Sequence, residues 1–398
     1  MPSRKTVKPR SAPRGSKGAG LPEAVLTGAG LPGAKPAVSN LGDIRHNIDA
    51  IDARIHGLLN ERARLAQLVG ISKTAAGKTV DFYRPEREAQ VLRKALERNK
   101  GPLRDEEVVR LFREIMSACL AQEEPLKVAF LGPEGTFTQT ALLKHFGHSV
   151  HALALATVDE VFQEVEAGNA DFGVVAIENS SEGTITNTLD RFLNSALHIC
   201  GEVELRIHHC LMGRMPGLEG IVRVCSHSQA LGQCRGWLAE HLPHAERVAV
   251  ASNAEGARRA RDEHGTAAIA GQTAAEVYGL NLLAREIEDH EDNATRFLVL
   301  GRRLLAPSGA DRTTLLVSVG DTHSPGTLYR LLEPLAQHGI SMTRIESRPS
   351  HRRRWDYVFF IDIEGHAEDA PVRAALEALQ QRASLFRVLG SYPRAVAG

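Results

Sequence analysis

A long stripe of apolar side chains with helical spacing begins at Leu41 and limits how this chain can fold. Large apolar residues recur there every three or four positions, which predicts one long helix that ends near Gly77. The stripe consists of Ile44, Ile48, Ile51, Ile55, Leu58, Leu59, Leu65, Leu68 and Val69. A helix cannot bury such a stripe alone. The two helical patterns that follow, Pro85 to Arg98 and Arg104 to Gln122, are much shorter and make a poor monomeric core, so we predict that this region dimerises.

Four cations accompany the stripe, and their spacing points to a site for a small polyanion. Arg62 and Lys73 are eleven residues apart, about three helical turns, so both lie on one face. Arg45 and Arg62 are seventeen residues apart, which is about 25 Å along one helix and too far to hold one metabolite. No proline lies between them, only Gly57. We therefore expect an intertwined dimer in which the partner's Arg45 reaches the site, with Arg87 from the next helix nearby.

Composition excludes several classes of function. Lys plus Arg and Asp plus Glu both number 48, so no net basic field attracts nucleic acid or an anionic membrane, and we expect neither partner. The sequence shows no apolar run of membrane-spanning length and no apolar signal core. The five cysteines lack C-x-x-C spacing, which predicts reduced thiols and a cytoplasmic protein without a disulfide framework or zinc site. They are Cys119, Cys200, Cys210, Cys225 and Cys234.

A length of 398 residues predicts about three domains. Residues 1–38 are rich in Pro, Gly and basic side chains and are expected to form a disordered basic tail; the Pro and Gly content opposes the amphipathic helix of a transit peptide. Residues 39–124 are helical. In 126–304 short strands alternate with helices, which predicts an α/β domain with a parallel-rich sheet. Residues 311–394 have the order βαββαβ of an α+β ferredoxin-like domain.

The helical region resembles the all-helical chorismate mutase family over residues 40–124, through the order Arg45, Glu61-Arg62, Lys73 and Arg87-Glu88. Rearrangement of chorismate to prephenate needs no nucleophile. It needs a site that holds a compact dicarboxylate and stabilises charge on the breaking ether oxygen. Arginine suits this task because its planar fork grips carboxylates with two hydrogen bonds.

The resemblance implies a role for each mutase residue. Arg45 of the partner and Arg62 bind carboxylates, Lys73 meets the ether oxygen, Arg87 orders the site, and Glu88 binds the substrate hydroxyl. Three positions depart from the family pattern. Cys119 and Glu123 stand where relatives often have Ser and Gln, and Arg84 replaces an acidic residue, which puts those contacts in question.

Four ordered motifs resemble prephenate dehydratase over residues 126–303. They are Gly-Pro-Glu-Gly-Thr-Phe-Thr at 132–138, Ile-Glu-Asn-Ser-Ser-Glu-Gly at 177–183, Ser-His-Ser-Gln at 226–229 and Asn-Ala-Thr-Arg-Phe at 293–297. The resemblance implies two lobes like a type II periplasmic binding protein, with substrate in the cleft. The first motif is not a dinucleotide-binding loop, because it lacks the third glycine and the acidic residue of such a site.

Prephenate loses carbon dioxide and hydroxide together, so the enzyme must protonate the leaving hydroxyl. The resemblance names Thr295 as that acid, and a threonine hydroxyl must be polarised by its neighbours to serve. Arg296 is either a carboxylate clamp or a structural ion pair, and Ser226 either binds substrate or caps the helix that follows. The other implied substrate-binding residues are Thr136, Phe137, Glu178, Asn179, Ser180, Gln233 and Phe297.

The C-terminal domain resembles the phenylalanine-binding ACT domain in two short segments. These are Gly326-Thr327-Leu328, where relatives have Gly-Ala-Leu, and Glu346-Ser347-Arg348-Pro349. The resemblance implies that these segments enclose phenylalanine at a dimer interface. His208 and His209 alternate across a strand and cannot share a metal ion, so no metal site is expected.

The whole order resembles the bifunctional chorismate mutase/prephenate dehydratase family. It implies conversion of chorismate through prephenate to phenylpyruvate, feedback inhibition by phenylalanine, no cofactor, and a homodimer or dimer of dimers. Two alternatives remain open. One is a dehydratase whose mutase arm is inactive, suggested by Cys119, Glu123 and Arg84. The other is a cytosolic amino-acid sensor that only binds its ligands.

Glu123 gives the mutase region a testable pH dependence. A carboxyl group can replace the donating amide of glutamine only while it is protonated, and burial favours that form. We therefore predict that mutase activity falls as pH rises and Glu123 ionises, and that Glu123→Gln removes this fall. Chorismate consumption by both proteins between about pH 5 and pH 9 measures the effect. A wild-type rate that is flat over this range contradicts the hypothesis.

Overall fold

The computed structural model describes residues 40–75, 83–122, 125–290, 292–320, 324–350 and 356–396. The chain divides into two units between His56 and Gly57. Three predictions concern parts that lie outside the described residues: the tail 1–38, Glu123, and the side chain of Lys73.

Helix α1 (Leu41–Ala75) runs without a break through Gly57 and confirms the predicted long helix. Its apolar stripe is exposed: ten large apolar side chains of α1 have exposed fractions between 41% and 65%. They are Leu41, Ile44, Ile48, Ile51, Ile55, Leu58, Leu65, Leu68, Val69 and Ile71. No helix in the described ranges, α1 included, is both long and apolar enough to cross a membrane.

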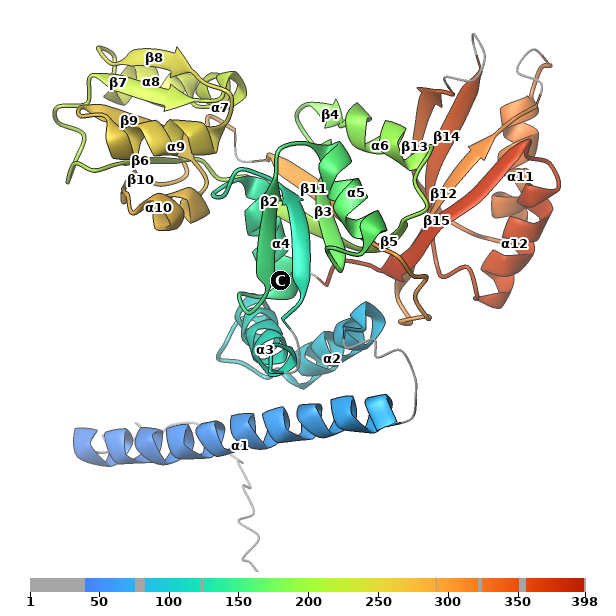
Figure 1. The fold of residues 1–398 in the computed structure, drawn as a ribbon, viewed down its shortest axis with the longest axis horizontal. Helices are drawn as coiled ribbons and strands as arrows, with labels where there is room; N and C mark the ends of the chain where they lie inside the picture. The colour runs from blue at the N-terminus through green and yellow to red at the C-terminus, as the bar shows by residue number, and fades with distance from the viewer. Residues whose placement is uncertain are drawn as a thin grey trace, which may run out of the picture. The chain divides into compact units, whose positions relative to one another are not determined.

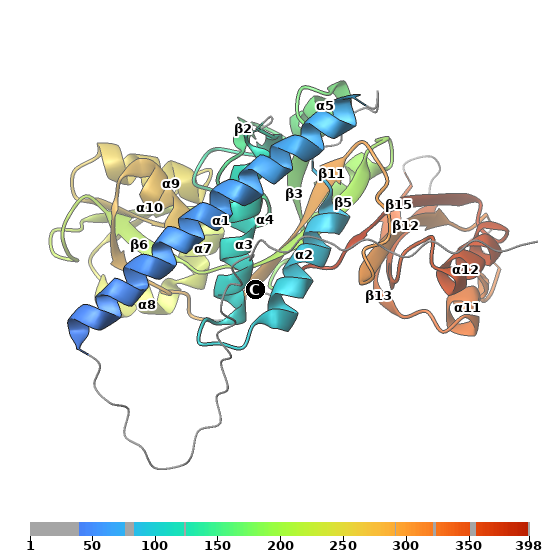
Figure 2. The same cartoon turned by 90° about the horizontal axis from the view of Figure 1, so that it is seen from below.

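Helices α2 (Pro85–Arg98) and α3 (Asp105–Leu120) form a pair that lies side by side in Figures 1 and 2. Pro85 occupies the first turn of α2, where the missing N–H costs nothing. Gly101, with a φ of +75°, and the following Pro102 separate the two helices, as predicted. Leu92 and Val109 are almost fully buried.

A six-stranded sheet forms the first lobe of the α/β region. Its order is β2-β1-β3-β11-β5, with the short β4 paired to β3. The strands are β1 (Lys127–Leu131), β2 (His151–Leu155), β3 (Phe172–Asn179), β4 (Gly183–Thr184), β5 (His198–Arg206) and β11 (Ala294–Gly301). Alternate side chains serve opposite faces. Val128 and Phe130 join the core with helix α4 (Phe137–Phe146), whereas Ala129 joins the core with α5 (Val158–Ala167) and α6 (Thr186–Phe192).

A five-stranded sheet, in the order β10-β6-β9-β7-β8, forms the second lobe. Its strands are β6 (Cys210–Gly213), β7 (Arg223–Ser226), β8 (Glu246–Ala249), β9 (Thr266–Ala270) and β10 (Asn281–Ala284). Its helices are α7 (Ser228–Gln233), α8 (Arg235–His241), α9 (Asn253–Asp262) and α10 (Gln272–Tyr278). The prediction of a parallel-rich sheet was wrong, because each sheet has two parallel pairings and the rest are antiparallel. Strand β11 returns from the second lobe and enters the first between β3 and β5 in the opposite direction.

The C-terminal domain confirms the βαββαβ prediction. Its elements are β12 (Asp311–Ser318), α11 (Thr327–Gln337), β13 (Met342–Pro349), β14 (Tyr357–Glu364), α12 (Ala370–Gln380) and β15 (Leu385–Pro393). The sheet order is β13-β14-β12-β15, and every pairing is antiparallel. Because β13 stands at one end of this order, it is an edge strand. Helices α11 and α12 lie next to each other, and their core includes Leu331 and Leu376 (Figure 1).

The C-terminal sheet packs directly on the first lobe. Ile199 and Leu298 of the first lobe share one buried cluster with Phe360 and Tyr392 of the C-terminal sheet. Strands β5 and β15 approach so closely that a Cβ on Gly390 would collide with the backbone carbonyl of Ile199. The two domains are therefore joined through a common core.

Candidate active site

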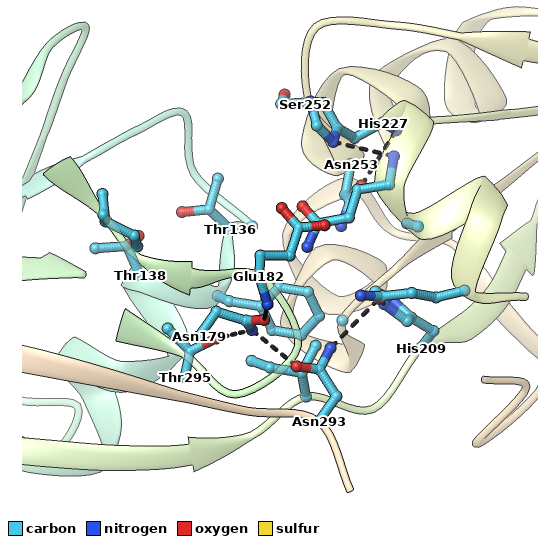
Figure 3. Close-up of a pocket in the computed structure, with 18 of the residues that line it drawn as sticks. Thr136, Thr138, Asn179, Glu182, His209, His227, Ser252, Asn253, Asn293 and Thr295 are labelled. Carbon is cyan, nitrogen blue, oxygen red and sulfur yellow. Dashed lines mark hydrogen bonds between the residues drawn. The ribbon is translucent and has the colours of Figure 1, made fainter. Parts of the chain in front are cut away.

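A cavity of about 430 Å³ lies between the two lobes of the α/β region (Figure 3). The first lobe contributes the segments 135–138 and 182–185, Asn179 and Thr295. The second lobe contributes His209, Gln229, Gln233 and the start of α9. The predicted residues Thr136, Phe137, Asn179, Gln233 and Thr295 therefore meet in one place, although the chain separates them widely. We call this space the interlobe cavity.

Four helices begin at the interlobe cavity. Their N-cap residues, Thr136, His227, Ser252 and Gly271, all line it. The side chains of Thr136 and Ser252 accept hydrogen bonds from the backbone N–H groups of Gln139 and Glu255, which fixes the first turns of α4 and α9. Helix N-termini present free N–H groups and a partial positive charge, which favour bound anions. Among the described lining residues there is no Lys or Arg, so these helix termini supply the positive potential.

Strands β3 and β11 deliver the central pair of side chains. In their antiparallel register Thr295 lies opposite Asn179, and Arg296 lies opposite Glu178. Successive residues of a strand point to opposite faces. Thr295 and Asn179 accordingly line the cavity, whereas Arg296 and Glu178 do not.

Backbone contacts fix the orientation of the Asn179 amide. Its Oδ1 accepts hydrogen bonds from the backbone N–H groups of Ser181 (3.0 Å) and Glu182 (3.1 Å). Because a backbone N–H can only donate, the Nδ2 of Asn179 must face the other way. It donates to Thr295 Oγ1 at 2.9 Å and to Asn293 Oδ1 at 2.8 Å (Figure 3). Thr295 therefore accepts from Asn179 and keeps its own hydroxyl proton for another partner.

The same chain of hydrogen bonds continues into the second lobe. Since Asn293 Oδ1 accepts from Asn179, its Nδ2 is the donor to Gln233 Oε1, at 3.3 Å. His209 Nε2 lies 2.7 Å from the same Gln233 oxygen, so the ring must carry its proton on Nε2. Burial lowers the pKa of His209, which keeps the ring neutral. The polarity of each hydrogen bond between His209 and Thr295 is thus assigned, with Gln233 Oε1 accepting from both His209 and Asn293, and we call this series the directed chain.

Arg296 forms a structural ion pair, one of the two roles considered for it. Its guanidinium lies 3.0 Å from Glu202 and 2.7 Å from Asp362 of β14, and it donates to Tyr392 Oη. Burial by itself would lower the pKa of Arg296, but Tyr392, Asp362 and Glu202 hold it above its usual value. The neighbouring Phe297 is buried in the core of the first lobe. Neither side chain lines the interlobe cavity.

Ser226, Ser180 and Glu178 also lie outside the cavity lining. The Ser226 hydroxyl proton lies between two acceptors, Ile269 O at 2.6 Å and Asn253 Oδ1 at 2.9 Å, and His227 instead of Ser226 caps the following helix. Ser180 links the end of β3 to the start of β11, because its hydroxyl donates to Asp292 O and accepts from Ala294 N. Glu178 pairs with an arginine of β13.

The sequence interpretation did not assign most of the residues that line the cavity, among them His209, Glu182 and Asn293. Glu182 and Asn293 belong to recognised motifs, so their motif membership was an available signal. His209 was considered only as a metal ligand. The alternation with His208 indicates that one of the two faces inward, and in the structure His209 is 2% exposed.

The comparisons with known proteins agree with this architecture. Three family models match successive segments: chorismate mutase type II at 44–124, prephenate dehydratase at 128–304 and ACT domain at 313–381. The bifunctional chorismate mutase/prephenate dehydratase of Stutzerimonas stutzeri is 54% identical over 357 residues, covering 89% of this chain and 97% of the relative. The protein of that name from Escherichia coli (strain K12) is 32% identical over 375 residues, covering 88% and 95%. The chain belongs to the bifunctional chorismate mutase/prephenate dehydratase family.

A solved structure supports the same assignment for the dehydratase and ACT domains. Prephenate dehydratase from Arthrobacter aurescens, determined in complex with L-Phe, matches with a TM-score of 0.62 and 38% identity. The match covers 69% of this chain and 93% of that chain.

The predicted mutase residues divide between several surfaces. Arg87 lines an open hollow of about 480 Å³ on α2 and α3, together with Lys94 and Arg98. Glu88 faces away from this hollow, 3.4 Å from Arg113, and burial raises its pKa. The other predicted side chains are Arg45, exposed on α1, Arg62, half-buried on α1, Arg84, paired with Glu86 at 2.6 Å, and Cys119, buried in α3.

The ACT segments have distinct surroundings. Gly326 adopts a φ of +76° at the start of α11, a conformation that favours glycine. Thr327 and Leu328 follow in the first turn of the helix. Glu346 and Arg348 of β13 contact the dehydratase domain through Thr184 and Asp190.

His209 and His208 form a matched pair for a test. His209→Phe keeps a planar ring but removes one of the two hydrogen bonds that Gln233 Oε1 accepts, at a net cost of about 0.5–1.5 kcal/mol. If that cost falls on the transition state, dehydratase kcat decreases by roughly 2- to 12-fold while mutase activity stays unchanged. His208→Phe removes a contact to Glu288 outside the cavity and should leave dehydratase activity near the wild-type value. Equal losses in steady-state assays of both variants would contradict the directed chain.

Proposed function

We propose that the chain rearranges chorismate to prephenate in its mutase domain and converts prephenate to phenylpyruvate in the interlobe cavity. The observation that carries the dehydratase assignment is the orientation of Asn179, which leaves the Thr295 hydroxyl free to donate. The family membership of the whole chain supports both activities.

The dehydratase step follows from the geometry around Thr295. The carbon–carboxylate bond of prephenate breaks and releases carbon dioxide, and its electron pair enters the ring. The ring carbon–hydroxyl bond breaks as Thr295 transfers its proton to the departing oxygen, so water leaves. The Asn179 N–H, 2.9 Å from Thr295 Oγ1, stabilises the resulting alkoxide until solvent returns a proton. Formation of the aromatic ring drives the reaction.

Binding of the prephenate dianion uses helix N-termini in this proposal. Helices α4 and α9, each ten residues long, begin at the interlobe cavity, and in this proposal the N–H groups of their first turns donate to the substrate carboxylates. A fixed set of backbone donors needs no reorganisation during the reaction. We accordingly assign the carboxylates to these termini and leave Arg296 out of the binding set.

The mutase proposal is an intertwined homodimer. The exposed apolar stripe of α1 supports it, since a stripe of that length needs a partner helix. Arg45 of one subunit and Arg62, Lys73 and Arg87 of the other then hold chorismate. Glu88 and position 123 complete the site, as the family resemblance implies, and Glu88 must leave Arg113 to do so.

The ACT domain binds phenylalanine and inhibits the dehydratase in this proposal. The relative of known structure was determined with L-Phe. The segments Gly326-Thr327-Leu328 and Glu346-Ser347-Arg348-Pro349 form the binding site, and the subunits assemble as a dimer or a dimer of dimers. The domain boundaries 39–124, 126–304 and 311–394 and a cytoplasmic location belong to the same proposal. All five cysteines are buried, which fits reduced thiols.

Replacement of Thr295 tests the catalytic proposal directly. Thr295→Ala removes the only proton that the directed chain leaves for the substrate, so dehydratase kcat should fall by at least about 100-fold. Thr295→Ser keeps the hydroxyl and should retain much of the rate. Phenylpyruvate formation, followed by ultraviolet absorbance, measures both, and chorismate turnover is the control that should not change. Absence of phenylpyruvate with the wild-type protein would favour the amino-acid sensor instead.

Subunit mixing tests the dimer. Arg45→Ala and Arg62→Ala should each abolish mutase activity, because each removes a carboxylate contact from every site. Mixing the two inactive proteins and allowing subunit exchange should restore one complete site per mixed dimer, and thus about a quarter of wild-type activity for random exchange between equal amounts. Mutase assays before and after exchange measure this recovery. No recovery in a mixture shown to have exchanged would mean that one chain builds the whole site.

A further inference from the structure

Three charged side chains on one face of β13 join the ACT domain to the dehydratase domain. Arg344, Glu346 and Arg348 alternate along the strand and therefore point to the same side. Arg344 Nε lies 3.1 Å from Glu178 Oε2, and its Nη2 donates to Thr184 Oγ1 at 3.2 Å. Thr184 Oγ1 in turn donates to Glu346 Oε2 at 2.9 Å.

Of the dehydratase partners, Thr184 lines the interlobe cavity, whereas Glu178 and Asp190 lie outside its lining. Glu178 immediately precedes Asn179, the residue that orients the Thr295 hydroxyl. Arg348 donates hydrogen bonds of 3.0 and 2.8 Å to Asp190. Asp190 belongs to α6, the helix that follows Thr184 along the chain. Side chains of the edge strand β13 thus contact Thr184 in the cavity lining and residues next to that lining.

Arg344 is the central member of this cluster. Its side chain is only 9% exposed and lies between two carboxylates, 3.1 Å from Glu178 and 3.9 Å from Glu346. A buried cation between two carboxylates is held by both, and its removal would leave them facing each other without a counter-charge. The Nε of Arg344 is close to Glu178 but has no aligned hydrogen bond, so the guanidinium is not committed to Glu178 alone.

A second contact between the domains does not involve β13. Arg296, opposite Glu178 in the strand register, is held by Asp362 of β14 and by Glu202 of β5. Both of those carboxylates are almost fully buried. The paired strands β3 and β11 are therefore held at a fixed buried point and at a second point on the edge strand that carries Glu346.

We propose that Arg344 is a positioning residue for the dehydratase cavity and the link through which an amino acid bound at Glu346-Ser347-Arg348-Pro349 changes that cavity. The effector part of this inference rests on the proposed phenylalanine site. The ammonium group of an amino acid needs a carboxylate, and Glu346 supplies one. When Glu346 turns to the ammonium, Thr184 loses its acceptor, and Arg344 shifts toward Glu178. The backbone that carries Thr184 and Glu178 then moves, and with it the cavity wall beside Asn179.

The test compares Arg344→Met with Arg382→Met in the full-length protein. Arg382 is also an ion-paired arginine of the ACT domain, but its partner Glu333, at 2.9 Å, lies within that domain. Three quantities are measured for each protein: dehydratase KM and kcat for prephenate, the same constants with saturating phenylalanine, and the Kd of phenylalanine by calorimetry. Mutase activity reports on the integrity of the rest of the chain.

Arg344→Met should raise the KM for prephenate by several fold with a smaller change in kcat, because the cavity wall is no longer held. Phenylalanine should still bind with a Kd within about threefold of the wild-type value, whereas its effect on the dehydratase, typically about 5- to 150-fold for coupled sites, should be largely lost. Arg344→Lys keeps the charge beside Glu178 and should restore part of the KM. Arg382→Met should match the wild type in every measurement.

Two results would overturn the inference. One is an Arg344→Met protein with wild-type KM and full inhibition. The other is equal damage in Arg382→Met. If the wild-type protein does not bind phenylalanine, both the proposed effector site and its coupling to the cavity through Arg344 are refuted. The KM of Arg344→Met for prephenate, measured without phenylalanine, then still tests whether Arg344 positions the cavity. If Arg344→Met loses mutase activity as well, Glu178→Gln breaks the same ion pair from the dehydratase side, and an unchanged KM in that variant would refute the positioning role.

Discussion

The pairing of β3 with β11 is the constraint on which the dehydratase domain depends. These strands come from segments more than a hundred residues apart, and β11 enters the first sheet only after the chain has built the second lobe. Because side chains alternate along each strand, one register places Thr295 and Asn179 at the interlobe cavity and turns Arg296 and Glu178 toward the ACT domain. The same strand pairing therefore positions both the cavity side chains and the side chains that contact the ACT domain. A shift of this register by one residue would turn the cavity-facing side chains toward the ACT domain and the others toward the cavity.

The described lining of the interlobe cavity contains neither Lys nor Arg, so its ordered hydrogen bonds come from neutral groups. Backbone N–H groups at Ser181 and Glu182 fix the Asn179 amide, and that amide fixes Thr295. Asn179, Asn293, Gln233 and Thr295 are neutral groups whose hydrogen bonds have set polarity, so this part of the chain does not depend on a titrating residue. Helix N-termini add positive potential at fixed positions, which in our proposal costs no side-chain entropy when the prephenate dianion binds. The proposed mutase site differs, because it uses long cationic side chains from two subunits.

Much of the fold was predictable from the sequence, because local signals carry it. The periodicity from Leu41 gave α1, the Gly101-Pro102 pair separated α2 from α3, and the βαββαβ order of the last domain followed from alternating patterns. The mixed sheets were not predictable in this way, since strand direction depends on where a distant segment re-enters. The same limit applies to the site. The motifs identified Thr295 and Asn179, but nothing local showed that Arg296 would meet Asp362.

The two attachments of the ACT domain differ in the property that matters for regulation. The Arg296 contact is enclosed by buried partners and by a shared hydrophobic core, so separating it would expose charge and apolar surface together. The Arg344 contact lies at an edge strand, and its partners Glu178 and Glu346 are 39% and 30% exposed, so water can replace lost partners at lower cost. A ligand with a modest binding free energy can rearrange the second contact and leave the first in place. The buried contact then serves as the fixed point about which the edge strand and the cavity wall can shift.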